Sequence, residues 1–175
     1  MYQPFEHLNG TARLTWQRSG FFDRSRYFLN FGEVCVGELE YQGLTKFSAQ
    51  MRTVEGSWQL EYTPFSELSV YDSQGKEFIY FDFNHWNKSG LLRVRESDTR
   101  ILMHRANWFS NRVIWRLENG TQVAEADFSM DWSSFSMKMQ LEIHHSLSAM
   151  VDPLVFGAIN LHSARYFFSQ RARRM

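Results

Sequence analysis

The sequence is poor in cysteine and proline. Its single cysteine, Cys35, cannot form an internal disulfide, which excludes the small disulfide-stabilised class of secreted domain. A lone thiol fits a reducing compartment, so we expect a cytoplasmic protein. The 3 prolines and the absence of low-complexity tracts argue against a disordered chain. The 175 residues are therefore predicted to form one domain that spans the whole chain.

Charge of one sign and long hydrophobic runs are also missing. Lysine plus arginine and aspartate plus glutamate both number 19, so we expect no nucleic-acid partner, which would favour a basic excess. The first ten residues do not resemble a signal peptide. The apolar segment near the C-terminus contains Asn160, His162 and Arg165 and is shorter than the roughly 20 residues that a membrane span needs. We therefore expect no transmembrane span.

The signatures of common catalytic sites are absent as well. The chain has no Gly-x-Ser-x-Gly, no Gly-x-Gly-x-x-Gly and no P-loop. The adjacent His144 and His145 would point to opposite faces of a strand, so only one of them could reach a given site. The sharpest zinc hypothesis combines His145 with His162 on the following helix. We nevertheless expect no metal site, no cofactor and no identifiable catalytic residue.

The chain does contain many aromatic residues, 17% of the total, and a regular alternation of apolar and polar side chains. The cleanest alternation runs from Phe135 to Ile143, and it is typical of an antiparallel strand with one buried face. Asn119-Gly120 joins two such windows and is typical of a tight hairpin turn. The spacing of the windows predicts about ten to twelve strands, mostly in up-and-down order, in a sandwich or a barrel.

The last part of the chain changes from strand to helix periodicity. Asp152 is a favourable N-cap and Pro153 suits the first helical position, so a helix is predicted at about 153–171. From Leu154 to Ala158 every residue is apolar or glycine, which is typical of a buried helix. A barrel of about twelve strands is wide enough to need filling. We therefore predict a mostly β protein, a closed antiparallel barrel of about twelve strands with this hydrophobic helix through its centre.

A rival packing lays the helix across the open face of a sandwich, but only one stripe of the helix would then need to be apolar. The helix Asp152–Leu161, together with segments such as Tyr27–Asn30 and Val70–Lys76, resembles the tubby-like superfamily, which includes phospholipid scramblases and LURP-one-related proteins. This resemblance implies a twelve-stranded barrel threaded by a C-terminal helix. The sequence lacks the phosphoinositide-binding, calcium-binding and palmitoylation patterns of those relatives, so their membrane roles do not carry over.

Several carboxylates are candidate site residues. Glu38 with Glu40, and Glu125 with Asp127, have the spacing of two that a glycosidase dyad on one strand face could use. Their opposite faces are apolar, so we expect all four carboxylates on a solvated outer face.

Asp82 lies within an apolar run. It is expected either at a wet edge or buried beside Arg93 or Arg95, in a structural role.

Two functions from different classes remain open. The first is a non-enzymatic barrel protein that binds a protein partner or an anionic lipid headgroup by a surface patch. The candidate binding residues are the basic tail and one tryptophan among turn formers: Arg165, Arg171, Arg173, Arg174 and Trp86. The alternative is a barrel-class hydrolase or other small-ligand-processing enzyme with its site at one barrel mouth. A filled interior favours the first function and an open interior the second.

Overall fold

The computed structural model describes residues 12–18, 25–42, 48–63, 67–84, 89–106, 111–131 and 136–172. Within them it contains twelve strands and two helices. The first six strands are β1 (Ala12–Arg18), β2 (Arg26–Phe31), β3 (Val34–Gln42), β4 (Ser48–Thr53), β5 (Ser57–Tyr62) and β6 (Glu67–Tyr71). The next six are β7 (Glu77–Asn84), β8 (Ser89–Val94), β9 (Thr99–Arg105), β10 (Arg112–Leu117), β11 (Gln122–Asp131) and β12 (Ser136–Ile143). The helices are α1 (His145–Ser148) and α2 (Pro153–Ala172).

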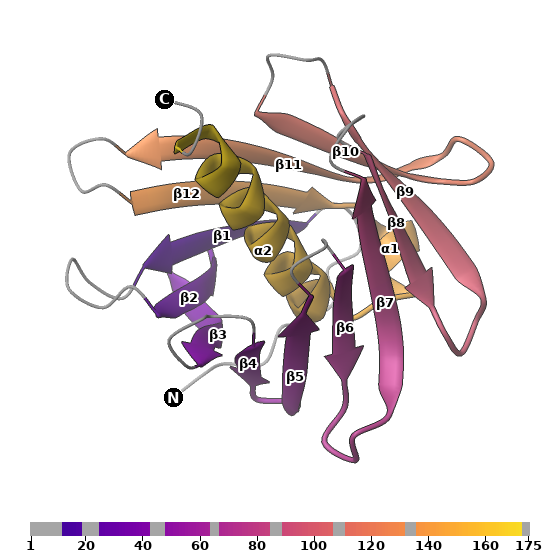
Figure 1. Ribbon diagram of the computed structural model, residues 1–175, viewed down its shortest axis with the longest axis horizontal. Helices are drawn as coiled ribbons and strands as arrows, with labels where there is room; N and C mark the ends of the chain where they lie inside the picture. The colour runs from indigo at the N-terminus through magenta and orange to yellow at the C-terminus, as the bar shows by residue number, and fades with distance from the viewer. Residues whose placement is uncertain are drawn as a thin grey trace.

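The strands form one closed antiparallel barrel. Each strand pairs with its neighbour in the chain, and β1 pairs with β12 to close the sheet, with Leu14 opposite Leu141 (Figure 1). The predicted barrel and its up-and-down order are therefore confirmed. The sandwich alternative is wrong, because the closed sheet has no open face across which a helix could lie.

The two ends of the barrel differ in how their strands are joined. At one end, which we call the turn end, short connections link β2 to β3, β4 to β5, β6 to β7, β8 to β9 and β10 to β11: residues 32–33, 54–56, 72–76, 95–98 and 118–121. At the other end, the loop end, six connections join β1 to β2, β3 to β4, β5 to β6, β7 to β8, β9 to β10 and β11 to β12. Most residues of those six connections lie outside the described part of the chain.

Local turn chemistry explains the turn end. Gly120 has φ 86° and its N–H donates to the Leu117 carbonyl at 2.9 Å, which confirms the predicted Asn119-Gly120 hairpin. Gly75 also has positive φ, at 78°, and the Asp72 carboxylate accepts the N–H groups of Gln74 and Lys76 in the same turn. These connections are therefore held by residues within a few positions of one another.

Side chains alternate between the barrel interior and the outer wall. In β7 Ile79, Phe81 and Phe83 are buried, while Asp82 between them is exposed. Gly90 on the neighbouring strand leaves room for the Phe81 ring, because a Cβ built at Gly90 would lie 2.5 Å from that ring. The inward side chains of all twelve strands form one continuous hydrophobic core.

Helix α2 begins as the sequence predicts. One carboxylate oxygen of Asp152 accepts the N–H groups of Leu154 and Val155, at 2.7 and 3.3 Å, so Asp152 is the N-cap. All residues from Pro153 to Leu161 are buried. The apolar sequence of these turns therefore matches an environment without water.

Strands from different parts of the barrel contact this helix. The indole N–H of Trp16 on β1 donates to the Gly157 carbonyl at 2.9 Å. The indole N–H of Trp115 on β10 donates to Oδ1 of Asn160 at 2.8 Å. Asn160 is 1% exposed, so this polar side chain lies within the core. Passage of the helix through the centre over its whole length stays a prediction, because side chains after Ser163 lie outside the description.

Candidate functional site

The predicted basic residues belong, in the sequence, to the second half of α2 and to the residues after it. The backbones of Arg165 and Arg171 belong to α2, but their side chains lie outside the described part, as do Arg173, Arg174 and the whole of Trp86. Their role in binding therefore stays a prediction.

The described structure does fix the end of the barrel that α2 approaches. The His162 ring stacks on Tyr62, the last residue of β5 at the loop end, with ring centroids 3.3 Å apart. From Ser163 to Ala172 the helix continues for about 15 Å at ~1.5 Å per residue.

The Trp86 connection starts at the same end. Its flanking residues Asn84 and Ser89 are paired across β7 and β8 at the loop end. The two segments that contain the five predicted binding residues thus leave the described structure at one end of the barrel. The sequence could not predict this, because the direction of α2 through the barrel depends on contacts between distant residues.

Three tyrosines and a histidine form a cluster at the loop-end mouth of the barrel, on β2, β3, β5 and α2. Tyr27, Tyr41 and Tyr62 point inward and are each 7% exposed or less. Tyr41 lies edge-on to Tyr27 at 6.0 Å and is stacked with Tyr62 at 6.3 Å between centroids. His162 is half-buried against Tyr41 and Tyr62. The cluster closes this part of the mouth with aromatic rings in mutual contact.

Sequence reasoning missed this cluster. The tyrosines stand 14 and 21 positions apart, and no local pattern relates them. A signal exists only at the level of strand ends, because Tyr27 is the second residue of β2, Tyr41 the last but one of β3 and Tyr62 the last of β5. That signal needs the strand bounds and the pairing register, which the structure supplies.

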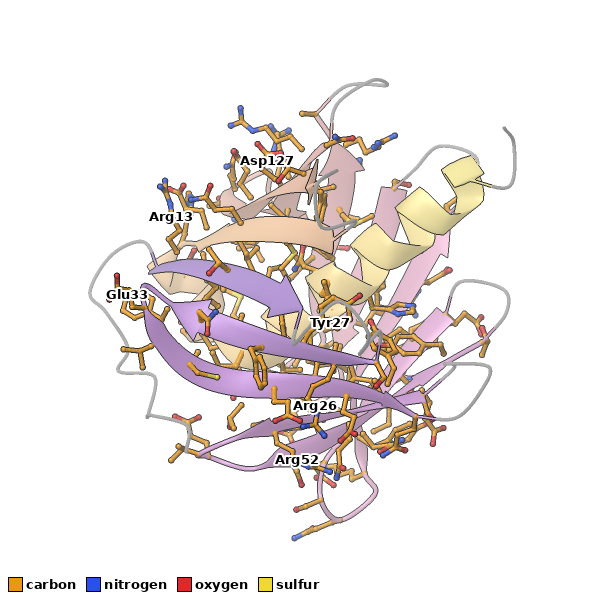
Figure 2. The ribbon with its side chains drawn as sticks, turned by 90° about the vertical axis from the view of Figure 1, so that its left-hand side faces the viewer. Arg13, Arg26, Tyr27, Glu33, Arg52 and Asp127 are labelled. Carbon is orange, nitrogen blue, oxygen red and sulfur yellow. The ribbon has the colours of Figure 1, made fainter. Side chains whose placement is uncertain are left out.

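The outer wall beside this mouth carries an ion-pair network across β2, β3 and β4. Arg26 contacts Glu38 at 3.1 Å and Glu40 at 3.3 Å, and Arg52 contacts Glu40 at 3.4 Å. Arg26 and Arg52 lie beside each other on this wall in Figure 2. Glu38 is only 7% exposed, so the expectation of a solvated carboxylate is wrong for this residue. Its arginine partner supplies the positive charge that a covered carboxylate needs.

The second carboxylate pair is also structural. Glu125 on the outer wall is ion-paired with Arg112 and accepts from Gln122 at 3.3 Å, while Asp127 is exposed. Glu125 is half-buried, and its carboxylate binds a neighbouring strand rather than facing Asp127 across a cleft. The pair therefore does not form a glycosidase-like site.

Asp82 lies exposed on the outer face of β7, which fits the first of its two expected environments. Arg95, one of its two predicted partners, binds Glu77 instead, at 2.7 Å.

The lone cysteine lies on β3 and is half-buried. Burial raises the pKa of the Cys35 thiol, so the reactive thiolate is disfavoured at neutral pH.

The histidine hypothesis finds no support from the backbone. His145 starts α1 beside β11, whereas His162 lies nine residues along α2 from Pro153, a rise of about 14 Å. Among the described residues, no three histidine, cysteine, aspartate or glutamate side chains are grouped to hold a metal ion. The absence of a metal site from the whole protein stays a prediction.

Comparison with protein-family models, with curated proteins and with solved structures finds no match to this chain. The tubby-like resemblance therefore stays a prediction. In the described part of the chain, neither helix has the length and apolar character needed to cross a bilayer.

Proposed function

We propose that this is a non-enzymatic binding protein, a barrel of the tubby-like kind, whose loop end binds a negatively charged protein partner or lipid headgroup. The observation that carries the proposal is the burial of α2 against inward-facing side chains of the strands. Phe156 is fully buried with its ring 4.8 Å from Trp115, and both indole donors, Trp16 and Trp115, are used by α2. Inward positions that could line a substrate pocket in an open barrel are here in contact with the helix.

The composition of the C-terminal segment supports an anionic ligand. From Pro153 to Met175 the sequence contains four arginines and no aspartate or glutamate. Arginine is suited to phosphate and carboxylate groups because its planar guanidinium can donate two parallel hydrogen bonds.

The composition of the strand connections supports the choice of end. The segments between strands at the loop end contain nine phenylalanine or tryptophan residues: Phe21, Phe22, Phe47, Phe65, Trp86, Trp108, Phe109, Trp132 and Phe135. The five connections at the turn end contain no phenylalanine, tryptophan or tyrosine. Aromatic residues are enriched both at protein interfaces and at the interfacial level of membranes.

An enzyme at the barrel mouth is the less favoured alternative. Its only described basis is the imidazole of His162 at the loop end. The neighbours of that imidazole are tyrosine rings that pack on one another. Packing therefore explains the position of His162 as well as a catalytic role would.

Vesicle co-sedimentation tests the lipid version of the proposal, and an acidic polypeptide immobilised on beads tests the protein version. The variant Arg171→Gln/Arg173→Gln/Arg174→Gln should lose binding by at least tenfold, since each cation near an anionic surface contributes about 1 kcal/mol. The matched control Arg93→Gln/Arg100→Gln/Arg116→Gln removes the same charge from exposed wall positions and should retain binding. Equal loss in both variants, or no binding of the native protein to either probe at low salt, would refute the proposal.

A further inference from the structure

The turn end of the barrel is acidic, although the whole chain has no net charge. The connections at this end and the segment from β12 to α2 carry seven carboxylates: Glu33, Glu55, Asp72, Glu96, Asp98, Glu118 and Asp152. They carry only two cations, Lys76 and Arg95.

Most of these carboxylates face water. The side chains of Glu96 and Glu118 are 69% and 62% exposed, and Glu33, Glu55 and Asp98 are exposed as well. Lys76 neutralises Glu96 at 2.8 Å. Arg100, at the start of β9, also pairs with Glu118, at 3.6 Å. A negative excess remains at this end after both ion pairs are counted.

Helix α2, whose last turns and following residues contain four arginines in the sequence, runs toward the opposite end. Helix α2 starts at Asp152, near the turn end, and its twenty residues rise by about 28 Å toward the loop end. Figure 2 shows Glu33 on the side of the molecule opposite the C-terminal end of α2. This length exceeds the Debye length of roughly 8 Å at physiological ionic strength, so the charges at the two ends act separately on a nearby surface.

We propose that the protein binds an anionic phospholipid membrane end-on, with the loop end toward the bilayer and the turn end toward solvent. This inference rests on the proposed function and adds an orientation to it. The acidic turn end would be repelled by the negative surface potential at the same time as the arginines are attracted. A neutral protein can thus bind an anionic surface with one orientation because its charges are separated along the barrel axis.

Site-specific fluorescence quenching tests the orientation. In a Cys35→Ser background, an environment-sensitive fluorophore is attached either to a Gln42→Cys variant, at the exposed loop-end terminus of β3, or to a Ser73→Cys variant, in the exposed Asp72–Lys76 turn. Both are bound to phosphatidylcholine–phosphatidylserine vesicles that contain a headgroup-level quencher. We expect strong quenching at position 42 and none at position 73. Equal quenching at both positions, or stronger quenching at position 73, would overturn the orientation.

A charge variant makes the test specific to the turn end. Glu33→Gln/Glu55→Gln/Glu118→Gln should allow a second binding mode, so that the fluorophore at position 73 becomes quenched several-fold more than in the parent.

The matched triple Glu61→Gln/Asp82→Asn/Asp127→Asn removes the same charge from exposed wall positions and should leave position 73 unquenched. An identical response of the two triples would contradict the inference. Failure of the parent to sediment with these vesicles would refute lipid binding itself, and the orientation with it. Binding without any difference between positions 42 and 73 refutes the orientation alone.

Discussion

The turn end and the loop end of this barrel are stabilised by different kinds of interaction. At the turn end, the connections are stabilised by glycines with positive φ and by side-chain hydrogen bonds between residues a few positions apart in the chain. At the loop end, the described contacts join residues far apart in the chain, such as Tyr41 with Tyr62 and both with His162. One end is thus determined by local conformational preference and the other by packing around α2.

The two ends also differ in composition. The turn end presents short, polar and acidic connections, whereas α2 runs toward the loop end, and the connections there are rich in aromatic residues in the sequence. A closed barrel has no exposed sheet edge to offer a partner, so recognition falls to its ends and walls. The following substitutions test whether the two ends respond as this comparison expects.

The largest expected effect is from Phe156→Asp, in the helix that connects the two ends. Phe156 is fully buried, so the substitution would place an unpaired charge where no water reaches it and leave a cavity beside Trp115. We expect no folded protein by circular dichroism. Phe156→Leu is the control and should fold with a loss of at most a few kcal/mol. A wild-type melting temperature for Phe156→Asp would show that the helix is not part of the core.

The next effect concerns a glycine near the loop end that packing requires. A Cβ at Gly90 would lie 2.5 Å from the Phe81 ring, so Gly90→Ala should lower the free energy of unfolding by about 1–3 kcal/mol through overpacking. At Gly157 the same atom would be 3.4 Å from Trp16, an ordinary contact, and alanine is the better helix former. Gly157→Ala should therefore be neutral or stabilising in urea unfolding. Equal losses for the two variants would contradict the packing described here.

These residues show how far sequence reasoning reaches. Sequence reasoning predicted the barrel strands from alternation, the Asn119-Gly120 hairpin from its turn residues and the helix from its cap at Asp152, because each depends on residues close together in the chain. It could not predict that Asn160 is buried against Trp115, or that Glu38 is covered by an arginine of another strand. Those features depend on barrel register and on the direction of α2. Register also decides where β11 ends, because Ser129 to Asp131 pair with Lys138 to Ser136 of β12.

At the turn end, the expected changes in stability come from the backbone angle φ and not from side-chain packing. Gly120→Ala should cost about 1 kcal/mol, because φ is 86° while no atom lies within 4 Å of the new Cβ. Asp98 has φ 49°, so Asp98→Gly should stabilise the protein by a few tenths to about 1 kcal/mol. Thermal unfolding measures both. A stabilising Gly120→Ala, or a destabilising Asp98→Gly, would show that backbone conformation does not determine this end.

The smallest expected effect is a pH-dependent change in stability caused by Tyr80, on the wall between the two ends. Burial and the neighbouring Glu67 raise the pKa of Tyr80 to about 12, from 10.0. A raised folded-state pKa contributes stability that is complete below pH 10 and is lost as pH rises toward 12. Wild type should thus lose more free energy of unfolding over this interval than Tyr80→Phe, in urea titrations at several pH values. Parallel profiles would contradict the shift.

Hydrogen exchange of the α2 backbone tests the central claim most directly, since the filled interior underlies both the fold and the proposed binding at the loop end. The amides from Val155 to Ser163 are predicted to exchange only when the whole protein unfolds, as slowly as the slowest amides of β11 and β12. Exchange of these amides by a local opening, orders of magnitude faster than global unfolding, would contradict a helix that is part of the barrel core.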